Sequence, residues 1–135
     1  MKIYKRTDWL ETAPADFWKE KCPFCTKRED EPEYIRWEWK HWYIMNNKYP
    51  ILGLDTHFMA IPKRHIKLAH DISPEEMSEY PKVEKVIYDF FEGKKYFTFM
   101  RESLESRSLE HIHYHFVPGW IPYDDIEIML KKQGF

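Results

Sequence analysis

The chain has 135 residues, of which 43% are hydrophobic and 18% aromatic, enough apolar material for the core of one domain over residues 1–135. Its 21 Lys and Arg against 23 Asp and Glu give a formal net charge of -2, which argues against a protein that coats nucleic acid through bulk charge. No run reaches the roughly eighteen apolar residues of a membrane helix, and the N-terminal residues lack the apolar centre of a signal peptide. We therefore expect a cytoplasmic protein without a membrane partner.

The first half of the chain predicts strands. Residues 34–45, YIRWEWKHWYIM, are rich in aromatic and β-branched residues and alternate approximately, which predicts two strands or one long bent strand. Residues 46–56 break this pattern with Asn, Pro and Gly. Residues 57–61, HFMAI, predict a third strand, which Pro62 would end because proline cannot donate to a central ladder.

A helix start is predicted at Ser73. Pro74 would take the first helical position and Glu76 stands three residues after the cap, which is the pattern of a capping box. Apolar residues then follow at helical spacing, so this helix should lay one face on a sheet. Pro81 is expected to kink or split the helix and Gly93 to end it.

The rest of the chain predicts two more strands and a short helix. Residues 96–100 and 111–117 have the strand pattern, and residues 124–132 form a helix that ends at Gly134. Long helical or irregular connections between strands favour an α+β domain. We expect a mainly antiparallel sheet of about five strands with a long helix packed across it.

The chain has two cysteines, Cys22 and Cys25, in the motif CPFC. They are too few for the disulfide framework of a small secreted domain, so they are a redox pair, half of a four-ligand metal site, or two free thiols. The redox interpretation is weak because a thioredoxin-like motif lies where a strand enters a helix, whereas CPFC precedes a charged stretch that ends in proline. A metal site needs two more ligands.

Three of the seven histidines, His111, His113 and His115, alternate with apolar residues in the run HIHYHFVPG. On a strand the imidazoles would share one face while their apolar neighbours face the core. The row could be a solvated polar face, or an all-histidine metal site, although the close carboxylate usual in such sites is missing before Asp124. In the third interpretation one imidazole is a nucleophile and its neighbours stabilise charge on a phosphate.

Three stretches in order, CPFC, THFMAIPKRHI and SLEHIHYHFVPG, resemble the motifs of the histidine triad superfamily, over roughly residues 20 to 120. This superfamily includes nucleoside phosphoramidate hydrolases, dinucleoside polyphosphate hydrolases and phosphorylases, and galactose-1-phosphate uridylyltransferase. The resemblance implies an α+β fold of antiparallel strands with a long helix across them, in agreement with the elements predicted above.

The resemblance also implies roles for single residues. His113 matches the nucleophile, which attacks the α-phosphorus and becomes a nucleotidyl-histidine; we expect a backbone carbonyl to hold its other ring nitrogen. His115 matches the residue that hydrogen-bonds to phosphate oxygens and to the departing group, and His57 matches a supporting histidine. Ser108 matches a group near the leaving atom, and Asn47 resembles the residue that meets the ribose hydroxyls.

Zinc-containing members of the superfamily suggest the two missing metal ligands. By this resemblance His65 and His111 complete a site with Cys22 and Cys25. Two thiolates and two imidazoles make a closed tetrahedral set, which is structural because it leaves no open position for substrate. The expected cofactor is therefore one structural zinc ion.

The turn before the triad, RESLESRS, departs from the family pattern. It contains no glycine, and Arg101 and Arg107 stand near the positions of an expected Asn and an expected Gln. Because Arg matches phosphate bidentately, either arginine would suit a longer or more anionic substrate, unless it is a solvated surface charge.

These observations predict a histidine triad hydrolase or nucleotidyltransferase that cleaves a nucleotide conjugate, a dinucleoside polyphosphate or nucleoside phosphoramidate, at its α-phosphate. The alternative is a non-catalytic nucleotide- or partner-binding module with the same fold and metal, and a metal-dependent hydrolase that uses the histidine row directly ranks behind both. The nucleobase, the leaving group, the acceptor and the formation of a homodimer stay open at this point.

Overall fold

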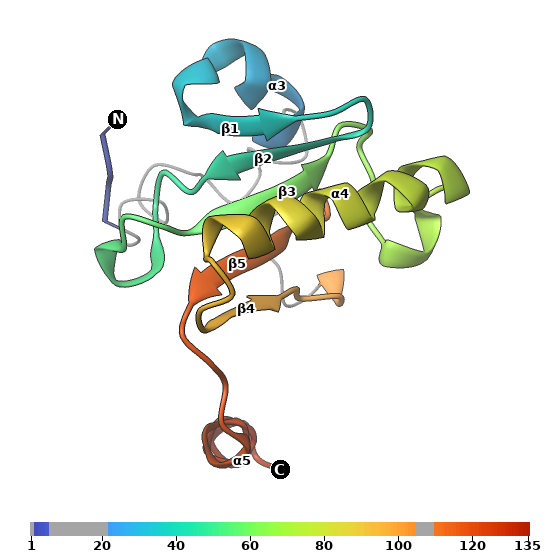
Figure 1. Ribbon diagram of the computed structural model, residues 1–135. Helices are drawn as coiled ribbons and strands as arrows, with labels where there is room; N and C mark the ends of the chain where they lie inside the picture. Colours follow the sequence, from blue (N-terminus) through green and yellow to red (C-terminus); the bar gives the residue numbers. More distant parts are fainter. Residues whose placement is uncertain (1, 6–21, 105–109) are drawn as a thin grey trace.

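The computed structural model describes residues 2–5, 22–104 and 110–135 of the chain (Figure 1). In these residues five strands form one antiparallel sheet in the order β1-β2-β3-β5-β4. The strands are β1 (Ile35–Glu38), β2 (Trp42–Asn46), β3 (Phe58–Pro62), β4 (Tyr96–Phe99) and β5 (Tyr114–Pro118). The helices are α3 (Pro23–Asp30), α4 (Pro74–Phe90) and α5 (Tyr123–Lys132), with short 3-10 turns at Pro32–Tyr34, Ile51–Gly53 and Ala69–Asp71. The predicted α+β fold is confirmed.

The core lies on both faces of the central strands β2 and β3, in which every residue is buried. Alternate residues of each strand join two apolar clusters, because successive side chains point to opposite faces of a sheet. One cluster, on the side of α3, contains Phe24, Tyr34, Tyr43, Met45, Met59 and Ile61. The other, under α4, contains Trp42, Ile44, Phe58, Ala60, Val83, Ile87 and Phe116. Figure 1 shows α4 lying across the sheet.

The start of α4 is confirmed as a capping box. The Ser73 hydroxyl accepts a hydrogen bond from the Glu76 N–H at 3.2 Å, and the Glu76 carboxylate accepts one from the Ser73 N–H at 2.8 Å. The predicted split at Pro81 is wrong, since α4 continues through this residue. Pro81 is exposed, so the carbonyl that loses its helical partner can bond to water instead.

The fifth strand begins at Tyr114, three residues later than predicted. The Ile112 N–H donates at 2.7 Å to the carbonyl of Ile66, in the loop after β3, rather than to a ladder partner in a neighbouring strand. His111 and His113 therefore lie in the segment that leads into β5, and of the three alternating histidines it is His115 that lies within the strand.

Helix α3 was not predicted, because its sequence PFCTKRED has no apolar face to give a helical period. The proline after Cys22 was the available signal, since proline favours the first helical position. The CPFC motif thus lies at the start of a helix, so the sequence argument against a redox pair does not hold. The side chains around the two cysteines must decide between a redox pair and a metal site.

Helix α5 lies beyond the edge strand β4, joined to β5 by residues 119–122 (Figure 1). Within the part of the chain that the structure describes, no helix is both long and apolar enough to cross a membrane.

Candidate active site and metal centre

His113 is held with one ring nitrogen ready to react. It is 6% exposed, and its Nδ1 lies 2.7 Å from the backbone carbonyl oxygen of His111. A carbonyl oxygen only accepts, so in the neutral ring the proton is on Nδ1 and the lone pair is on Nε2. The backbone carbonyl expected from the sequence is therefore present.

His57 and His115 form a second unit through their rings. The Ile51 N–H donates to Nδ1 of His57 at 3.1 Å, and Nε2 of His57 lies 2.8 Å from Nδ1 of His115. Because Nδ1 of His57 accepts, its proton is on Nε2, which donates to His115. In its neutral form His115 then carries its own proton on Nε2. The hydrogen bond from the Ile51 N–H to His57, followed by the one from His57 to His115, thus sets the tautomers of both imidazoles.

The rings of His113 and His115 lie side by side, with centroids 4.8 Å apart. Phe99 of β4 stacks on His115 with ring centroids 4.5 Å apart, and Phe24 packs edge-to-face against His113 with ring centroids 5.0 Å apart. His115 pairs with Met59 across the sheet, so both side chains lie on the face opposite α4. The arrangement combines a nitrogen lone pair with a neighbouring N–H donor among apolar rings, which suits nucleophilic attack on a centre that develops negative charge.

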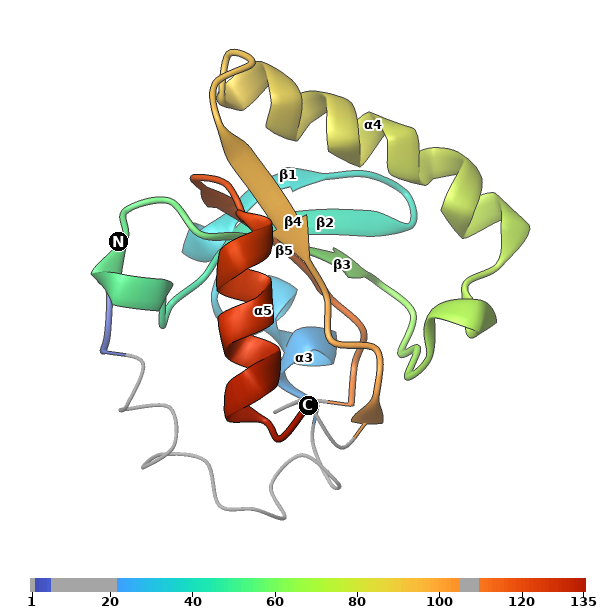
Figure 2. The same cartoon turned by 90° about the horizontal axis from the view of Figure 1, so that it is seen from below.

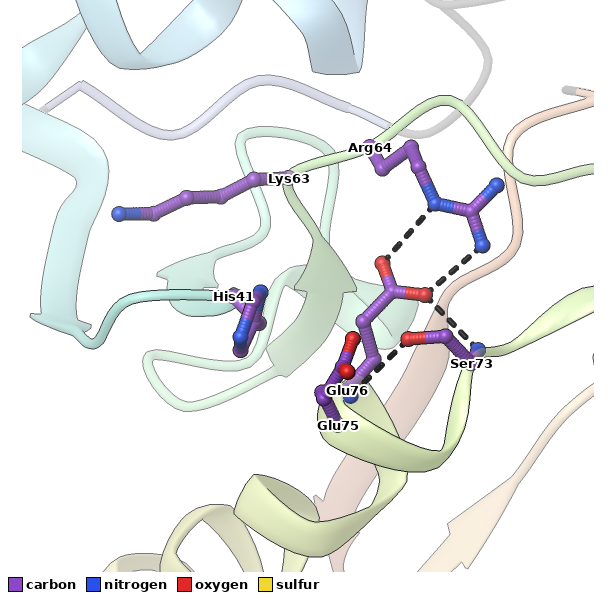
Figure 3. A pocket seen from close by; sticks show the side chains of 6 residues that line it. All are labelled: His41, Lys63, Arg64, Ser73, Glu75 and Glu76. Carbon is purple, nitrogen blue, oxygen red and sulfur yellow. Dashed lines mark hydrogen bonds and ion pairs between the residues drawn. The ribbon is translucent and has the colours of Figure 1, made fainter.

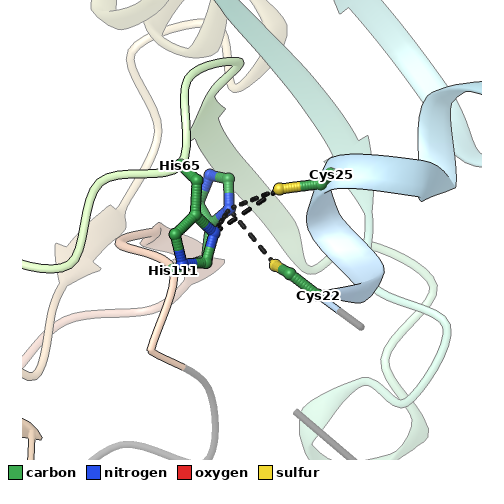
Figure 4. Close-up of side chains that lie close together, drawn as sticks. All are labelled: Cys22, Cys25, His65 and His111. Carbon is green, nitrogen blue, oxygen red and sulfur yellow. Dashed lines mark hydrogen bonds between the residues drawn. The ribbon is translucent and has the colours of Figure 1, made fainter. Parts of the chain in front are cut away.

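Four side chains gather next to this pair, as Figure 4 shows. Their ligand atoms all lie within 4.8 Å of one another, and they come from Cys22, Cys25, His65 and His111. Nδ1 of His111 lies 3.3 Å from the Cys22 sulfur and 3.2 Å from Nδ1 of His65. The start of α3, the loop after β3 and the segment before β5 thus meet at one point that could hold a metal ion.

The protonation of His111 fits a metal ligand. Nε2 of His111 lies 2.8 Å from the carbonyl oxygen of Pro62, so this nitrogen carries the proton and Nδ1 offers its lone pair to the cluster. The ring is fully buried, and burial lowers the pKa of His111 to about 4, so it is neutral at pH 7. Burial also raises the pKa of the Cys22 thiol to about 11, so a bound cation would have to displace its proton.

Several solved structures with a similar arrangement of elements are described as histidine triad proteins. A histidine triad nucleotide-binding protein of Candida albicans matches with a TM-score of 0.62 at 21% identity, over 84% of this chain and 94% of that one. A histidine triad family hydrolase of Clostridium thermocellum matches with a TM-score of 0.60 at 22% identity, over 75% and 92%. The chain has the histidine triad fold.

A third solved structure, of a hypothetical histidine triad nucleotide-binding protein from Sulfolobus tokodaii, matches with a TM-score of 0.60 at 25% identity, over 75% of this chain and 70% of that one. No protein-family model and no curated protein matches the sequence. The likeness is therefore carried by the arrangement of strands and helices around the triad.

Asn47 lies beside the triad's supporting histidine. Its N–H donates to the carbonyl of His57 at 2.7 Å, and its side-chain oxygen accepts from the Tyr49 N–H at 2.8 Å. Its neighbour Asn46, which was not predicted, accepts from the His57 N–H at 3.1 Å and donates to the carbonyl of Asp55 at 3.0 Å. The two adjacent asparagines were the available signal in the sequence, since Asn side chains commonly hydrogen-bond to nearby backbone groups.

Of the three other predicted site residues, the structure describes Arg101 alone. Arg101 follows β4 and is half-buried. Ser108 and Arg107 lie outside the described residues. The roles of all three stay predictions.

A pocket of about 370 Å³ lies away from the triad, between the end of β3 and the start of α4 (Figure 3). Its lining residues are His41, Lys63, Arg64, Ser73, Glu75 and Glu76. Arg64 and Glu76 form an ion pair at 2.8 Å, and Glu76 also closes the capping box with Ser73. Burial raises the pKa of Glu76, but the hydrogen bonds from Arg64 and Ser73 outweigh it and lower the pKa to about 2. These groups stabilise the start of α4 by bonding to one another.

Proposed function

We propose that this chain is a nucleotidyl hydrolase or transferase that cleaves a nucleotide conjugate at its α-phosphate through a covalent intermediate on His113. The observation that carries the proposal is the hydrogen bond from Nδ1 of His113 to the His111 carbonyl, which leaves the Nε2 lone pair for attack. The names of two proteins with the same fold, a nucleotide-binding protein and a hydrolase, support the class of substrate and reaction.

In the first step Nε2 of His113 attacks the α-phosphorus. The nitrogen–phosphorus bond forms, the bond from phosphorus to the leaving group breaks, and the leaving atom keeps the electron pair of that bond and takes a proton from solvent. In the second step water or another acceptor attacks the same phosphorus and releases His113. His115 donates its Nε2–H to the charge that develops on the phosphate oxygens and the leaving atom, without moving between the two steps.

We further propose that Cys22, Cys25, His65 and His111 hold one structural zinc ion. Two thiols and two imidazoles whose Nδ1 atoms lie in the cluster are a donor set that zinc prefers. Zinc would supply free energy of folding by tying α3 to the segment before β5. His111 thereby has two tasks, because its side chain binds in the cluster while its carbonyl orients His113.

Rapid quenching with substrate labelled at the α-phosphate tests the covalent step. Label is expected on His113, and His113→Ala should lower turnover of both a nucleoside phosphoramidate and a dinucleoside polyphosphate by at least about a thousandfold. His70→Ala is the matched control, since this histidine is exposed and distant in sequence. Full activity of His113→Ala would overturn the mechanism. Nucleotide binding without turnover by the native chain would favour a non-catalytic binding module instead.

A further inference from the structure

Phe99 lies flat against the ring of His115. It is the last residue of β4 and the direct partner of His115 across the sheet. Figure 2 views the sheet from the β4 edge, with β4 in front of β5. Partners in an antiparallel pair have Cβ atoms about 5 Å apart, which brings two flat side chains within reach of each other. The planes of the two rings differ by 7°, so the pairing of the strands places an apolar ring on one face of the imidazole.

The plane of the His115 ring is set by packing rather than by its hydrogen bond. His57 donates to Nδ1 of His115 at 2.8 Å, which sets the direction of that nitrogen but lets the ring tilt about the bond. The torsion of a histidine ring about its Cβ–Cγ bond is broad by itself. The rings of His57 and His113 meet His115 at 51° and 70°, whereas Phe99 is nearly parallel to it. A tilt of His115 would lose the flat contact with Phe99.

The plane of His115 matters because its Nε2–H is the donor in the proposed reaction. Nε2 lies off the axis of the hydrogen bond at Nδ1, so a tilt about that bond turns the Nε2–H away from its acceptor. A hydrogen bond weakens steeply with such a turn. A donor that already points at the developing charge costs no reorganisation when the reaction takes place.

We propose that Phe99 is a positioning residue, which holds the plane of His115 so that its Nε2–H points at the developing charge. The inference rests on the proposed function, since it concerns the donor in that reaction. Phe99 acts through His115 and not on the substrate itself.

Phe97 offers a matched control for Phe99. It lies two residues earlier in β4, so its side chain is on the same face of the sheet, and both side chains are half-buried. Phe97 pairs with Val117 across the sheet, whereas Phe99 pairs with His115. Replacing Phe97 thus removes the same ring from the strand at a position that is not the partner of the histidine.

Steady-state kinetics with a nucleoside phosphoramidate tests the consequence for the reaction. Phe99→Leu should lower kcat about tenfold while KM changes less than about twofold, because the loss falls on the transition state. Phe99→Met, a second variant without a ring, should behave alike, and Phe99→Tyr should recover most of the rate because it restores the flat face. Phe97→Leu should keep the native kcat. A native kcat in both Phe99→Leu and Phe99→Met, or an equal fall in Phe97→Leu, would overturn the inference.

Imidazole NMR tests the position of His115 without any substrate. The Nε2–H of His57 is held in its hydrogen bond to His115, so this proton should exchange slowly with water in the native chain. It should exchange at least about fivefold faster in Phe99→Leu, and at the native rate in Phe97→Leu. An unchanged exchange rate in Phe99→Leu would overturn the inference even if kcat falls. Absence of turnover by the native chain would defeat the proposed function instead, and the exchange rates would then decide the inference alone.

Discussion

At the scale of single residues, the tautomers of neighbouring histidines decide what the site can do. His113 and His115 are the same residue type two positions apart, yet the structure gives them opposite roles. His113 donates through Nδ1 to a carbonyl, whereas His115 accepts at Nδ1 from His57. One ring therefore offers a lone pair at Nε2 and the other offers a proton there.

Ile51→Pro tests whether the backbone N–H of Ile51 sets this arrangement. Proline removes the donor to His57 and suits the backbone, since residue 51 opens a 3-10 turn and Pro50 before it is already extended. We expect kcat to fall roughly tenfold to a hundredfold with little change in KM. The ring nitrogen shifts of His57 and His115 in NMR should move as well.

Ile51→Ala is the control for this variant, because it removes the side chain and keeps the N–H. It should retain most of the native kcat. If Ile51→Ala and Ile51→Pro lower kcat equally, the side chain matters and the N–H does not.

His115→Ala tests the proposed donor to the developing charge. Since that charge is largest in the transition state, we expect kcat to fall by about a hundredfold or more while the Kd of a nucleoside monophosphate changes only a few-fold. Single-turnover kinetics and calorimetric titration measure the two quantities. A loss of binding as large as the loss of rate would assign His115 to ground-state binding.

At the scale of elements, the proposed metal centre joins three segments that are far apart in the sequence, namely the start of α3, the loop after β3 and the segment before β5. Metal analysis of protein purified without chelator should find one zinc per chain, and removing it should lower the Tm because the metal contributes folding free energy. His65→Ala should lose zinc and lower the Tm, whereas His70→Ala, an exposed histidine of the same loop region, should do neither. Protein that holds no zinc and melts unchanged with chelator would contradict the assignment.

The start of α4 should make the fold sensitive to acid. The folded pKa of Glu76, about 2, lies below its ordinary value of 4.5, so its contribution is complete above about pH 5 and is lost as the pH falls toward 2. Urea unfolding of Glu76→Gln should therefore show a smaller loss between pH 6 and pH 3 than the native chain. The exposed Glu75→Gln should behave like the native chain.

At the scale of the whole molecule, the net charge of -2 does not attract anionic substrates, so any preference for polyphosphate must come from a local cation. Arg101→Ala should then weaken kcat/KM for a dinucleoside polyphosphate more than for a phosphoramidate. Lys85→Ala removes the same charge from an exposed position of α4 and should change neither. Equal effects of Arg101→Ala on both substrates would show that Arg101 does not bind the polyphosphate group.

The sequence by itself determined the features that depend on near neighbours. The aromatic and β-branched residues of 34–45 predicted β2, and the run HFMAI predicted β3; all residues of both strands are buried. The Ser73 capping box predicted the start of α4, since its two hydrogen bonds join residues three apart. The resemblance to the histidine triad superfamily implied the four ligands, and the structure brings these four side chains together.

Only the tertiary structure decided the features that depend on distant partners. The tautomer of His111 follows from its bond to the Pro62 carbonyl, 49 residues away in the chain, and that of His115 follows from its bond to His57, 58 residues away. The late start of β5 follows from the hydrogen bond of Ile112 to Ile66, and no local pattern contains it.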